Sequence, residues 1–152
     1  MIVQIAGIPE EGLWLKENLD AKALKLESEE LKFSGPIAVS AFVQKQDKDL
    51  FVEAEVESGL SLVCGRCLEP YAKPYHETLQ MDVPIKDQPG VDVSDDIRQE
   101  IILTYPMNFM CQEDCKGLCQ TCGKNLNEGQ CNCASKSSAE HLAGDAGNSQ
   151  QL

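Results

Sequence analysis

Apolar and acidic side chains alternate with a period of two in the stretch FVEAEVE, residues 51–57. Successive side chains of a β-strand point to opposite faces of a sheet, so this pattern predicts a strand with one buried and one hydrated face. The side chains expected to face a hydrophobic core are Val52, Ala54 and Val56. Those expected to face water are Glu53, Glu55 and Glu57.

Further strand patterns lie on both sides of this stretch. They are found at residues 2–8, 36–45, 60–63 and 75–83. Turn residues at 46–49 and at Ser58-Gly59 separate the central patterns. Strands joined by such short connections predict an antiparallel β meander or a small open barrel.

Two segments are expected to be helical. Residues 11–31 place apolar side chains at helical spacing, although residues 23–27 also alternate like a strand. Ser94 is followed by two acidic residues, and a Ser side chain can cap the free amides at a helix start, where acids are also favourable. This second helix is expected at about residues 95–104 and across the sheet. The fold class is therefore α+β, with one or two helices.

The composition changes after Pro106. Residues 111–133 hold six of the eight cysteines and little apolar material. Such a segment cannot hold a fixed shape by burial alone and needs cross-links. We therefore divide the chain into a β-rich core domain with one packed helix (1–106), a cysteine-rich zinc module (107–133) and a polar tail that is expected to be disordered (134–152).

The cysteines form four close pairs. These are Cys64 with Cys67, Cys111 with Cys115, Cys119 with Cys122, and Cys131 with Cys133. Zinc is held by four tetrahedral ligands, and a C-x-x-C turn supplies two thiolates, so the pattern predicts two structural zinc ions. We favour one site made of the last four cysteines, which lie within fifteen residues, and a second made of the first four. Spacing alone leaves other pairings open.

The compartment decides whether these cysteines could instead form disulfides. The first residues lack a basic region and their apolar run stops at Pro9, so no secretory signal is expected. No stretch approaches the roughly 18 apolar residues of a membrane span. We expect a cytoplasmic protein without membrane association, in which thiols stay reduced. Four disulfides, or cysteines that act as small buried hydrophobic residues, are the alternatives.

Catalytic patterns are weak. His76 and His141 are the only histidines, and we find no phosphate-binding loop, Ser–His–Asp pattern or paired catalytic carboxylates. A C-x-x-C pair can be a redox centre, but thiol oxidoreductases place it before a helix, whereas Cys64 follows a strand. A closed four-thiolate zinc site also lacks the open position that catalysis needs. We expect a non-catalytic protein.

Several strings of the sequence are characteristic together. They are VCGRCLE (63–69), EIIL (100–103) running to Pro106, CQEDCKGLCQTCGKNLN (111–127) and CNC (131–133). In these strings the chain resembles the bacterial YceD family of large ribosomal RNA subunit accumulation proteins, over roughly residues 35–133. The resemblance implies a role in ribosome biogenesis, in making or stabilising large-subunit ribosomal RNA, without an established catalytic activity. Many relatives end in a short basic, apolar segment, whereas the tail from Ala134 is polar, and some relatives lack the distal cysteines.

The acidic composition bears on the partner. A formal charge of −12 opposes the approach of RNA, because phosphate neutralisation needs an excess of Lys and Arg. The favoured mode is docking on a basic ribosomal or assembly protein through Glu53, Glu55 and Glu57. The second mode is a local patch that stacks on or pairs with ribosomal RNA. Its residues are Arg66, Tyr71, Lys73 and Tyr75, with Lys116 and Lys124.

Two other classes of function stay open on the sequence. One is a dithiol redox protein, in which one cysteine pair is accessible and has a low pKa. The other is a zinc-stabilised protein-interaction module unrelated to ribosomes. In each case we expect a monomer.

Overall fold

The computed structural model describes residues 1–133, so the tail expected at 134–152 lies outside the described residues. The chain divides into two compact units. The first, called the sheet unit, comprises residues 1–63 and 70–109. The second, called the cysteine unit, comprises residues 64–69 and the segment that begins at residue 110. A short loop between two strands therefore belongs to the same unit as the cysteine-rich segment far along the chain.

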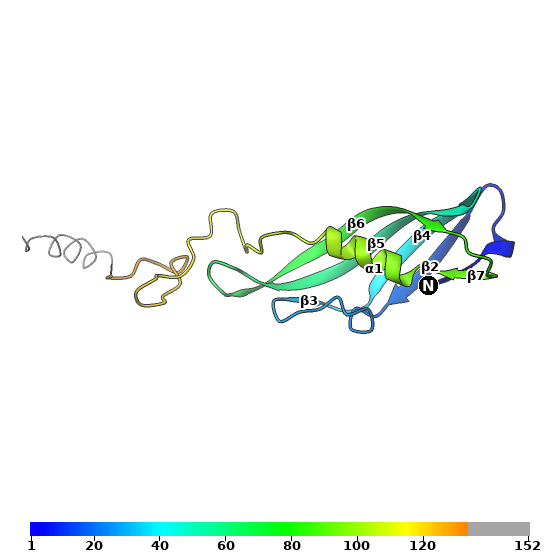
Figure 1. Ribbon diagram of the computed structural model, residues 1–152. Helices are drawn as coiled ribbons and strands as arrows, with labels where there is room; N and C mark the ends of the chain where they lie inside the picture. The colour runs from blue at the N-terminus through cyan, green and yellow to red at the C-terminus, as the bar shows by residue number, and fades with distance from the viewer. Residues whose placement is uncertain (134–152) are drawn as a thin grey trace, which may run out of the picture. The chain divides into compact units, whose positions relative to one another are not determined.

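The sheet unit is built on a five-stranded antiparallel sheet (Figure 1). Its strands are β2 (Leu13–Leu19), β3 (Leu31–Phe33), β4 (Ile37–Gln46), β5 (Asp49–Val63) and β6 (Pro70–Pro84). Strand β5 pairs with β6 along its whole length and, on its other side, with β4 and then β3. Within residues 1–133, β2 and β6 do not pair with each other, so the sheet is open rather than a closed barrel.

A second, two-stranded antiparallel sheet completes the strands of this unit. It joins β1 (Ile2–Gln4) to β7 (Gly90–Asp92), and a 3-10 turn, η1 (Ile5–Gly7), follows β1. The first strand expected from the sequence is therefore present but shorter than residues 2–8. Strand β7 lies in a segment whose sequence does not predict a strand.

The alternation that predicts β5 is confirmed. Val52, Ala54 and Val56 are fully buried, and Glu55 and Glu57 are exposed. The turn expected before β5 is also present, as the two-residue connection between Gln46 and Asp49. The turn expected at Ser58-Gly59 is wrong, because β5 continues through it. Gly59 pairs with Pro74 and Ser58 with Tyr75, so the ladder to β6 is unbroken there.

The helix expected within residues 11–31 is wrong. Residues 13–19 form strand β2, which pairs antiparallel with β4 from Leu13 opposite Val43 to Leu19 opposite Ile37. The edge of β4 offers unpaired backbone groups, and pairing there buries Leu19 in the core. Tertiary pairing therefore overrides the helical spacing, as local propensity is a weak determinant on its own.

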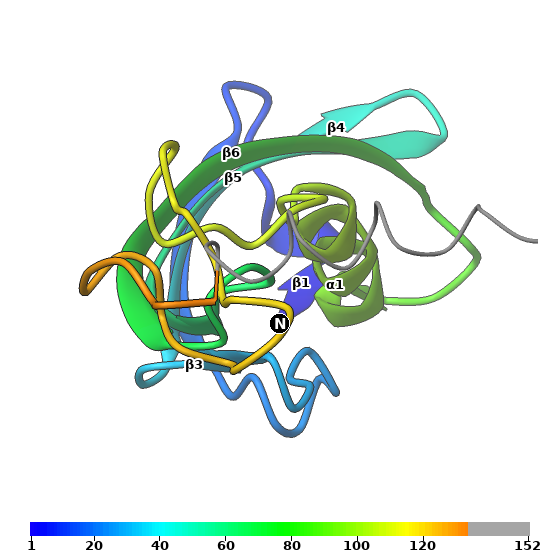
Figure 2. The same cartoon turned by 90° about the vertical axis from the view of Figure 1, so that its left-hand side faces the viewer.

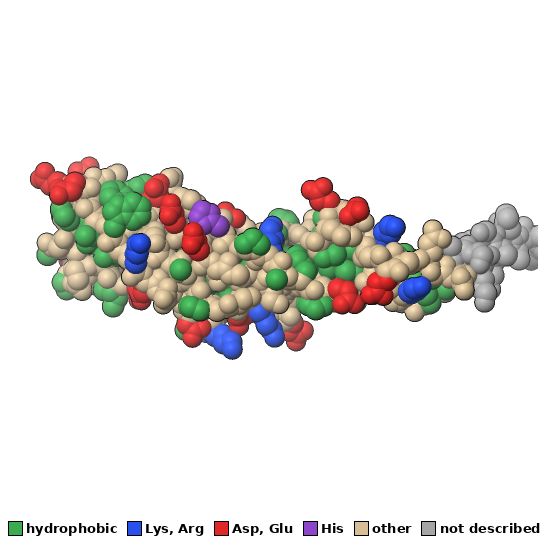
Figure 3. Space-filling model, turned by 180° about the vertical axis from the view of Figure 1, so that it is seen from behind, with side chains coloured by type: hydrophobic (Ala, Val, Ile, Leu, Met, Phe, Trp, Pro, Cys, Tyr) green, Lys and Arg blue, Asp and Glu red, His purple; other side chains and the backbone are tan. Residues whose placement is uncertain are grey.

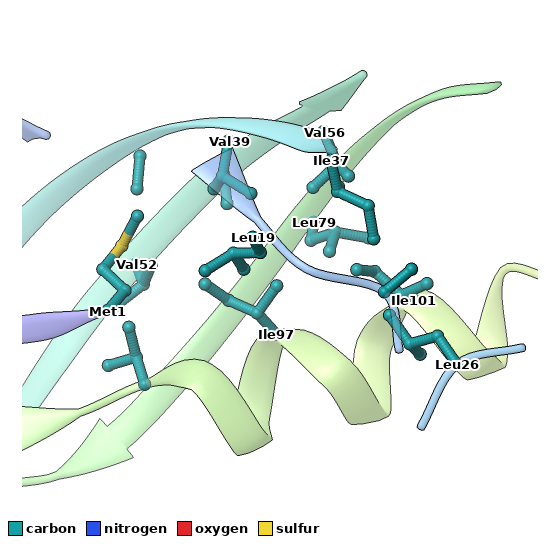
Figure 4. Close-up of a cluster of buried hydrophobic side chains, with 14 of the residues drawn as sticks. Met1, Leu19, Leu26, Ile37, Val39, Val52, Val56, Leu79, Ile97 and Ile101 are labelled. Atoms are coloured by element: carbon teal, nitrogen blue, oxygen red, sulfur yellow. The ribbon is translucent and has the colours of Figure 1, made fainter. Parts of the chain in front are cut away.

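The second expected helix is confirmed as α1 (Ser94–Leu103), and it is the one α-helix within residues 1–133. Val93 rather than Ser94 is its N-cap, and no side chain caps the helix; Ser94 Oγ instead donates to Asp92 Oδ1 at 2.6 Å. Ile97 and Ile101 are fully buried and face Leu79 on the sheet (Figure 4). The sheet curves around the helix in Figure 2, so α1 covers one sheet face, and no helix of residues 1–133 covers the opposite one. We call the latter the outer face.

The helix and the residues that follow it also hold the loop after β2. Arg98 Nε donates to the carbonyl of Leu24 at 2.6 Å, and the Tyr105 hydroxyl donates to the carbonyl of Leu26 at 2.9 Å. Leu26 is buried beside α1 (Figure 4). Among the described residues, no helix has the length and apolar character that a membrane span requires.

Candidate metal centres

Cys64 and Cys67 lie in the loop between β5 and β6. The loop closes on itself, because the amide of Leu68 donates to the carbonyl of Cys64 at 2.9 Å and the amide of Cys64 donates to the carbonyl of Glu69 at 3.0 Å. The amide of Arg66 donates to the sulfur of Cys64 at 3.5 Å. A turn of this kind holds two thiols together and directs a backbone dipole at one of them.

These two thiols form one cluster with Cys111 and Cys115. The four Sγ atoms all lie within 4.8 Å of one another, and Cys64–Cys115 and Cys67–Cys111 are each separated by 3.7 Å. Three of the residues are buried and Cys111 is half-buried. We call this group the buried cluster. The amide of Cys111 donates to Cys64 Sγ at 3.4 Å, and Asn127 Nδ2 donates to Cys115 Sγ at 3.3 Å.

The remaining cysteines form a second cluster. The Sγ atoms of Cys119, Cys122, Cys131 and Cys133 also lie within 4.8 Å of one another. Cys122 is exposed and the other three are half-buried, so we call this group the exposed cluster. Its first two cysteines lie in a tight turn, in which the amide of Gly123 donates to the carbonyl of Cys119 and the amide of Cys119 donates to the carbonyl of Lys124, each at 2.8 Å.

The geometry of the buried cluster fits a tetrahedral metal site. Four sulfur atoms at the Zn–S distance of about 2.3 Å from one centre lie about 3.8 Å apart. The observed separations of 3.7 Å agree with this value, and they are far longer than a disulfide bond of about 2.05 Å. All eight cysteines are free. The two clusters are the grouping that the spacing favoured, and each is positioned to hold a metal ion.

Electrostatics distinguish the thiols within each cluster. Backbone amides, first that of Cys67, lower the pKa of Cys64 to about 6, against the opposing effect of burial. The amides of Cys122 and Thr121 lower the pKa of Cys119 to about 6. Burial raises the pKa of Cys111 to about 12. Without a cation, the buried cluster therefore retains protons such as that of Cys111, because burial disfavours its thiolate. Metal binding would displace these protons.

The glutamates proposed for docking lie on the outer face of the sheet. Glu53 Oε2 accepts a hydrogen bond from Gln80 Nε2 at 2.6 Å, and Glu57 Oε1 lies 3.4 Å from His76 Nε2. Trp14 and Phe42 extend the same row, because Trp14 pairs with Phe42 and Phe42 pairs with Glu53 across the sheet. The two rings are 5.4 Å apart, and Trp14 is 57% exposed. Figure 3 shows acidic side chains beside a hydrophobic patch on this face.

The pairing of Trp14 with Phe42 is not among the features predicted from the sequence. The helical assignment of residues 11–31 concealed the alternation of residues 13–16, in which exposed Trp14 and Lys16 alternate with half-buried Leu13 and Leu15. This period of two was the signal that could have found Trp14.

One aromatic residue of the proposed RNA patch is buried. Tyr75 is 5% exposed, its ring packs edge-on against Phe33 at 6.0 Å, and its hydroxyl hydrogen-bonds to Thr104 Oγ1. Its ring is therefore unavailable for stacking on a base, which corrects that part of the expectation. Tyr71 and Lys73 lie with it on β6 in the sheet unit, half-buried and exposed respectively.

The other basic candidates belong to the cysteine unit and bind its own backbone in two cases. Arg66 Nη1 donates to the carbonyl of Cys115 at 3.1 Å, and Lys124 Nζ donates to the carbonyl of Gln130 at 3.1 Å. The side chain of Lys116 is exposed. Arg66 and Lys124 therefore stabilise the loops around the clusters and also contribute to the surface charge.

Over residues 1–133, fold and site together define the class: antiparallel sheets with one α-helix and two four-cysteine centres able to hold a metal ion. The family model described as "Large ribosomal RNA subunit accumulation protein YceD" matches residues 76–144. Over these residues the chain is similar to the YceD family, which agrees with the resemblance carried by the cysteine strings.

Two curated relatives carry the same name, "Large ribosomal RNA subunit accumulation protein YCED homolog 1, chloroplastic". The one from Zea mays is 32% identical over 142 residues, which cover 64% of this chain and 48% of the relative. The one from Arabidopsis thaliana is 40% identical over 43 residues, which cover 28% of this chain and 13% of the relative. This chain therefore spans about half the length of the maize protein at most. No solved structure matches the chain.

Proposed function

We propose that this chain is a non-catalytic accessory protein of ribosome biogenesis, which supports the accumulation or processing of large-subunit ribosomal RNA and holds two structural zinc ions. The family name supports the process. The observation that carries the metal assignment is the convergence of two sets of four cysteine sulfurs, each within 4.8 Å. Cys64, Cys67, Cys111 and Cys115 would hold one ion. Cys119, Cys122, Cys131 and Cys133 would hold the other.

Four thiolates favour a structural over a catalytic metal. All-cysteine tetrahedral sites are typical of structural zinc, whereas catalytic zinc keeps one position for water. Once bound, the ion supplies a cross-link and compensates the thiolate charge. The chain's own backbone contributes too, because the amides of Arg66 and Cys111 point at Cys64 Sγ. Such hydrogen bonds stabilise the thiolate form that the metal requires.

Metal analysis tests this assignment. We expect about two zinc ions per chain in protein purified in reducing buffer, and protection of the cysteines from alkylation until a chelator is added. A metal content near zero in the folded, reduced chain would reject the assignment. Iron in place of zinc would retain the sites and change the identity of the ion, since iron also binds four cysteine thiolates.

A dithiol redox protein is the second candidate, favoured by the exposed position of Cys122 beside Cys119, whose pKa is lowered to about 6 by backbone amides. A low-pKa accessible thiol is the reactive form of cysteine. Alkylation followed by mass spectrometry separates the two functions. The redox function predicts rapid modification of Cys119 or Cys122 in the untreated protein, whereas the metal function predicts modification only after chelation.

For the partner, we propose a basic ribosomal or assembly protein that docks on the outer face. Glu53, Glu55 and Glu57 occupy alternate positions of β5 on this face, and Trp14 supplies exposed apolar area next to them. Complementary charge increases the association rate and selects the partner, while a rigid aromatic side chain contributes binding energy. The overall charge of −12 strengthens the attraction to a basic protein and opposes RNA.

Charge reversal with a matched control tests the docking proposal. The variant Glu53→Lys/Glu55→Lys/Glu57→Lys should lose co-purification of ribosomal or assembly proteins at low salt. The control Glu10→Lys/Glu11→Lys/Glu29→Lys changes the net charge equally on exposed residues of loops. Equal loss in both variants would assign binding to the overall field rather than to this face. Crosslinks to RNA at Tyr71 or Lys73, with none to protein, would favour the RNA mode instead.

A further inference from the structure

We infer that Asn127 couples the two cysteine clusters, so that metal in the exposed cluster strengthens the hold of the buried cluster on its own metal. This inference rests on the proposed metal binding. Asn127 is not a ligand, and it lies in the segment between the two pairs of the exposed cluster. Its side chain nevertheless contacts a sulfur of the buried cluster.

The side chain of Asn127 is fully engaged in hydrogen bonds. Its Nδ2 donates to Cys115 Sγ at 3.3 Å and to Asn125 Oδ1 at 3.0 Å. Its Oδ1 accepts from the amide of Lys116 at 2.9 Å and from Gln112 Nε2 at 3.4 Å. The side-chain amide therefore joins the loop that carries Cys115 to the segment between the two cysteine pairs of the exposed cluster. A side chain used in this way orients the ligand rather than merely covering it.

The backbone around the exposed cluster determines where Asn127 lies. Leu118 and Asn125 form an antiparallel bridge, and the amide of Leu126 donates to the carbonyl of Gly117 at 2.9 Å. These bonds close the turn that contains Cys119 and Cys122. Cys119 and Cys122, held by this turn, would share a metal with Cys131 and Cys133, and this cross-link would fix the segment on both sides of Asn127. Without this cross-link, little apolar burial orders the segment, because its residues are half-buried or exposed.

Ordering of Asn127 would raise the affinity of the buried cluster for its metal. A hydrogen bond from an amide N–H favours the thiolate that binds the metal, and loss of such an outer contact typically costs about 10–100-fold in metal affinity. If filling the exposed cluster orders Asn127, filling the buried cluster must favour the exposed site by the same factor. Two sites that share no ligand would then load and release metal cooperatively.

A pair of aspartate variants tests the contact. Asn127→Asp replaces the donating Nδ2 with a carboxylate oxygen at almost unchanged volume. Asn125→Asp adds the same charge two residues away but retains the accepting Oδ1. The full zinc-loaded chain is mixed with excess EDTA, and zinc release is followed with a chromogenic indicator. We expect two phases in the wild type, with the slow one from the buried cluster.

The rate of the slow phase of zinc release tests whether Asn127 supports the buried cluster. We expect Asn127→Asp to accelerate it by about 10–100-fold, with the Asn125→Asp rate within about twofold of wild type. The neutral variant Asn127→Ala, checked by circular dichroism for an intact sheet unit, separates loss of the donor from added charge. Equal slow rates in wild type, Asn127→Ala and Asn127→Asp would overturn the inference.

A double-mutant cycle tests the coupling itself. Cys122→Ser, which removes an exposed ligand, should accelerate the slow phase when Asn127 is present and should add nothing in the Asn127→Ala background. Additive effects of the two changes would overturn the coupling. A wild-type chain that binds no zinc would instead reject the proposed function, whereas a chain that binds about two ions with an unresponsive slow phase rejects only the role of Asn127.

Discussion

The two units of this chain differ in what fills their interiors. The sheet unit has one hydrophobic core, to which β-strands and α1 contribute fully buried side chains such as Ile37, Leu50 and Ile101. In the described part of the cysteine unit, the buried hydrophobic residues are all cysteines, namely Cys64, Cys67 and Cys115. A fully buried aliphatic side chain contributes about 1.5–3 kcal/mol, whereas a structural zinc site supplies about 10–16 kcal/mol of binding free energy. The units are therefore expected to fail under different treatments.

Metal removal should produce the largest effect and should act on one unit only. Incubation of the reduced protein with EDTA is expected to abolish hydrogen-exchange protection of the amides at residues 110–133, because these residues lack an apolar core. The amides of β4, β5 and β6 should keep their protection. Exchange measured by mass spectrometry before and after chelation checks this. Protected amides at residues 110–133 in metal-free, reduced protein would contradict the contrast between the units.

Substitution of single cysteines should affect the two clusters of the cysteine unit separately. Both Cys64→Ser and Cys122→Ser are expected to lower the zinc content from about two ions to about one per chain, because each removes one of four ligands. Cys64→Ser should expose the loop at residues 64–69 and the region of Cys111 and Cys115 to exchange. Cys122→Ser should affect the segment after Leu118 and leave the buried cluster loaded. Identical exchange patterns in the two variants would mean that the clusters are grouped differently.

A cavity in the hydrophobic core should destabilise the sheet unit and leave the cysteine unit unaffected. Ile101→Ala removes a fully buried side chain of α1 and should lower the free energy of unfolding of this unit by about 2–5 kcal/mol. The zinc content should not change. Leu103→Ala is the matched control on the same helix, since Leu103 is 76% exposed and its truncation is expected to cost little. Chemical denaturation followed by far-UV circular dichroism measures both, and equal destabilisation would contradict the packing of α1.

The smallest effect is expected from alanine substitutions at two glycines of the cysteine unit. Gly117 and Gly123 both have φ of +74°, a conformation that costs a residue with Cβ about 1–2 kcal/mol. A Cβ at Gly117 would also lie 3.2 Å from the carbonyl oxygen of Arg66, whereas one at Gly123 would meet nothing within 4 Å. Gly117→Ala should therefore accelerate zinc release from the buried cluster more than Gly123→Ala does. Equal rates of zinc release in the two variants would show that the close approach of residue 117 to Arg66 does not affect the stability of the buried cluster.

Sequence patterns identified the central strands and the close pairs of cysteines for a physical reason. Period-two alternation in residues 51–57 and short cysteine spacings are local features, and each is sufficient to define its element. The assignment of residues 11–31 failed because β2 depends on the edge of β4, a partner that helical spacing cannot reveal. The stacking role of Tyr75 failed for a related reason, since its burial depends on Phe33 and Thr104, which lie far from it in the chain.

By itself, the amino-acid sequence determined that β5 has one apolar and one acidic face and that eight cysteines occur as four close pairs, because both properties are set by neighbouring residues. Only the tertiary structure decided which pairs share a cluster, that Trp14 lies in the same row of the outer face as Glu53, and that Asn127 reaches Cys115. These relations join residues from distant parts of the chain. They arise when strand pairing and loop closure bring such segments together, which no local pattern can specify.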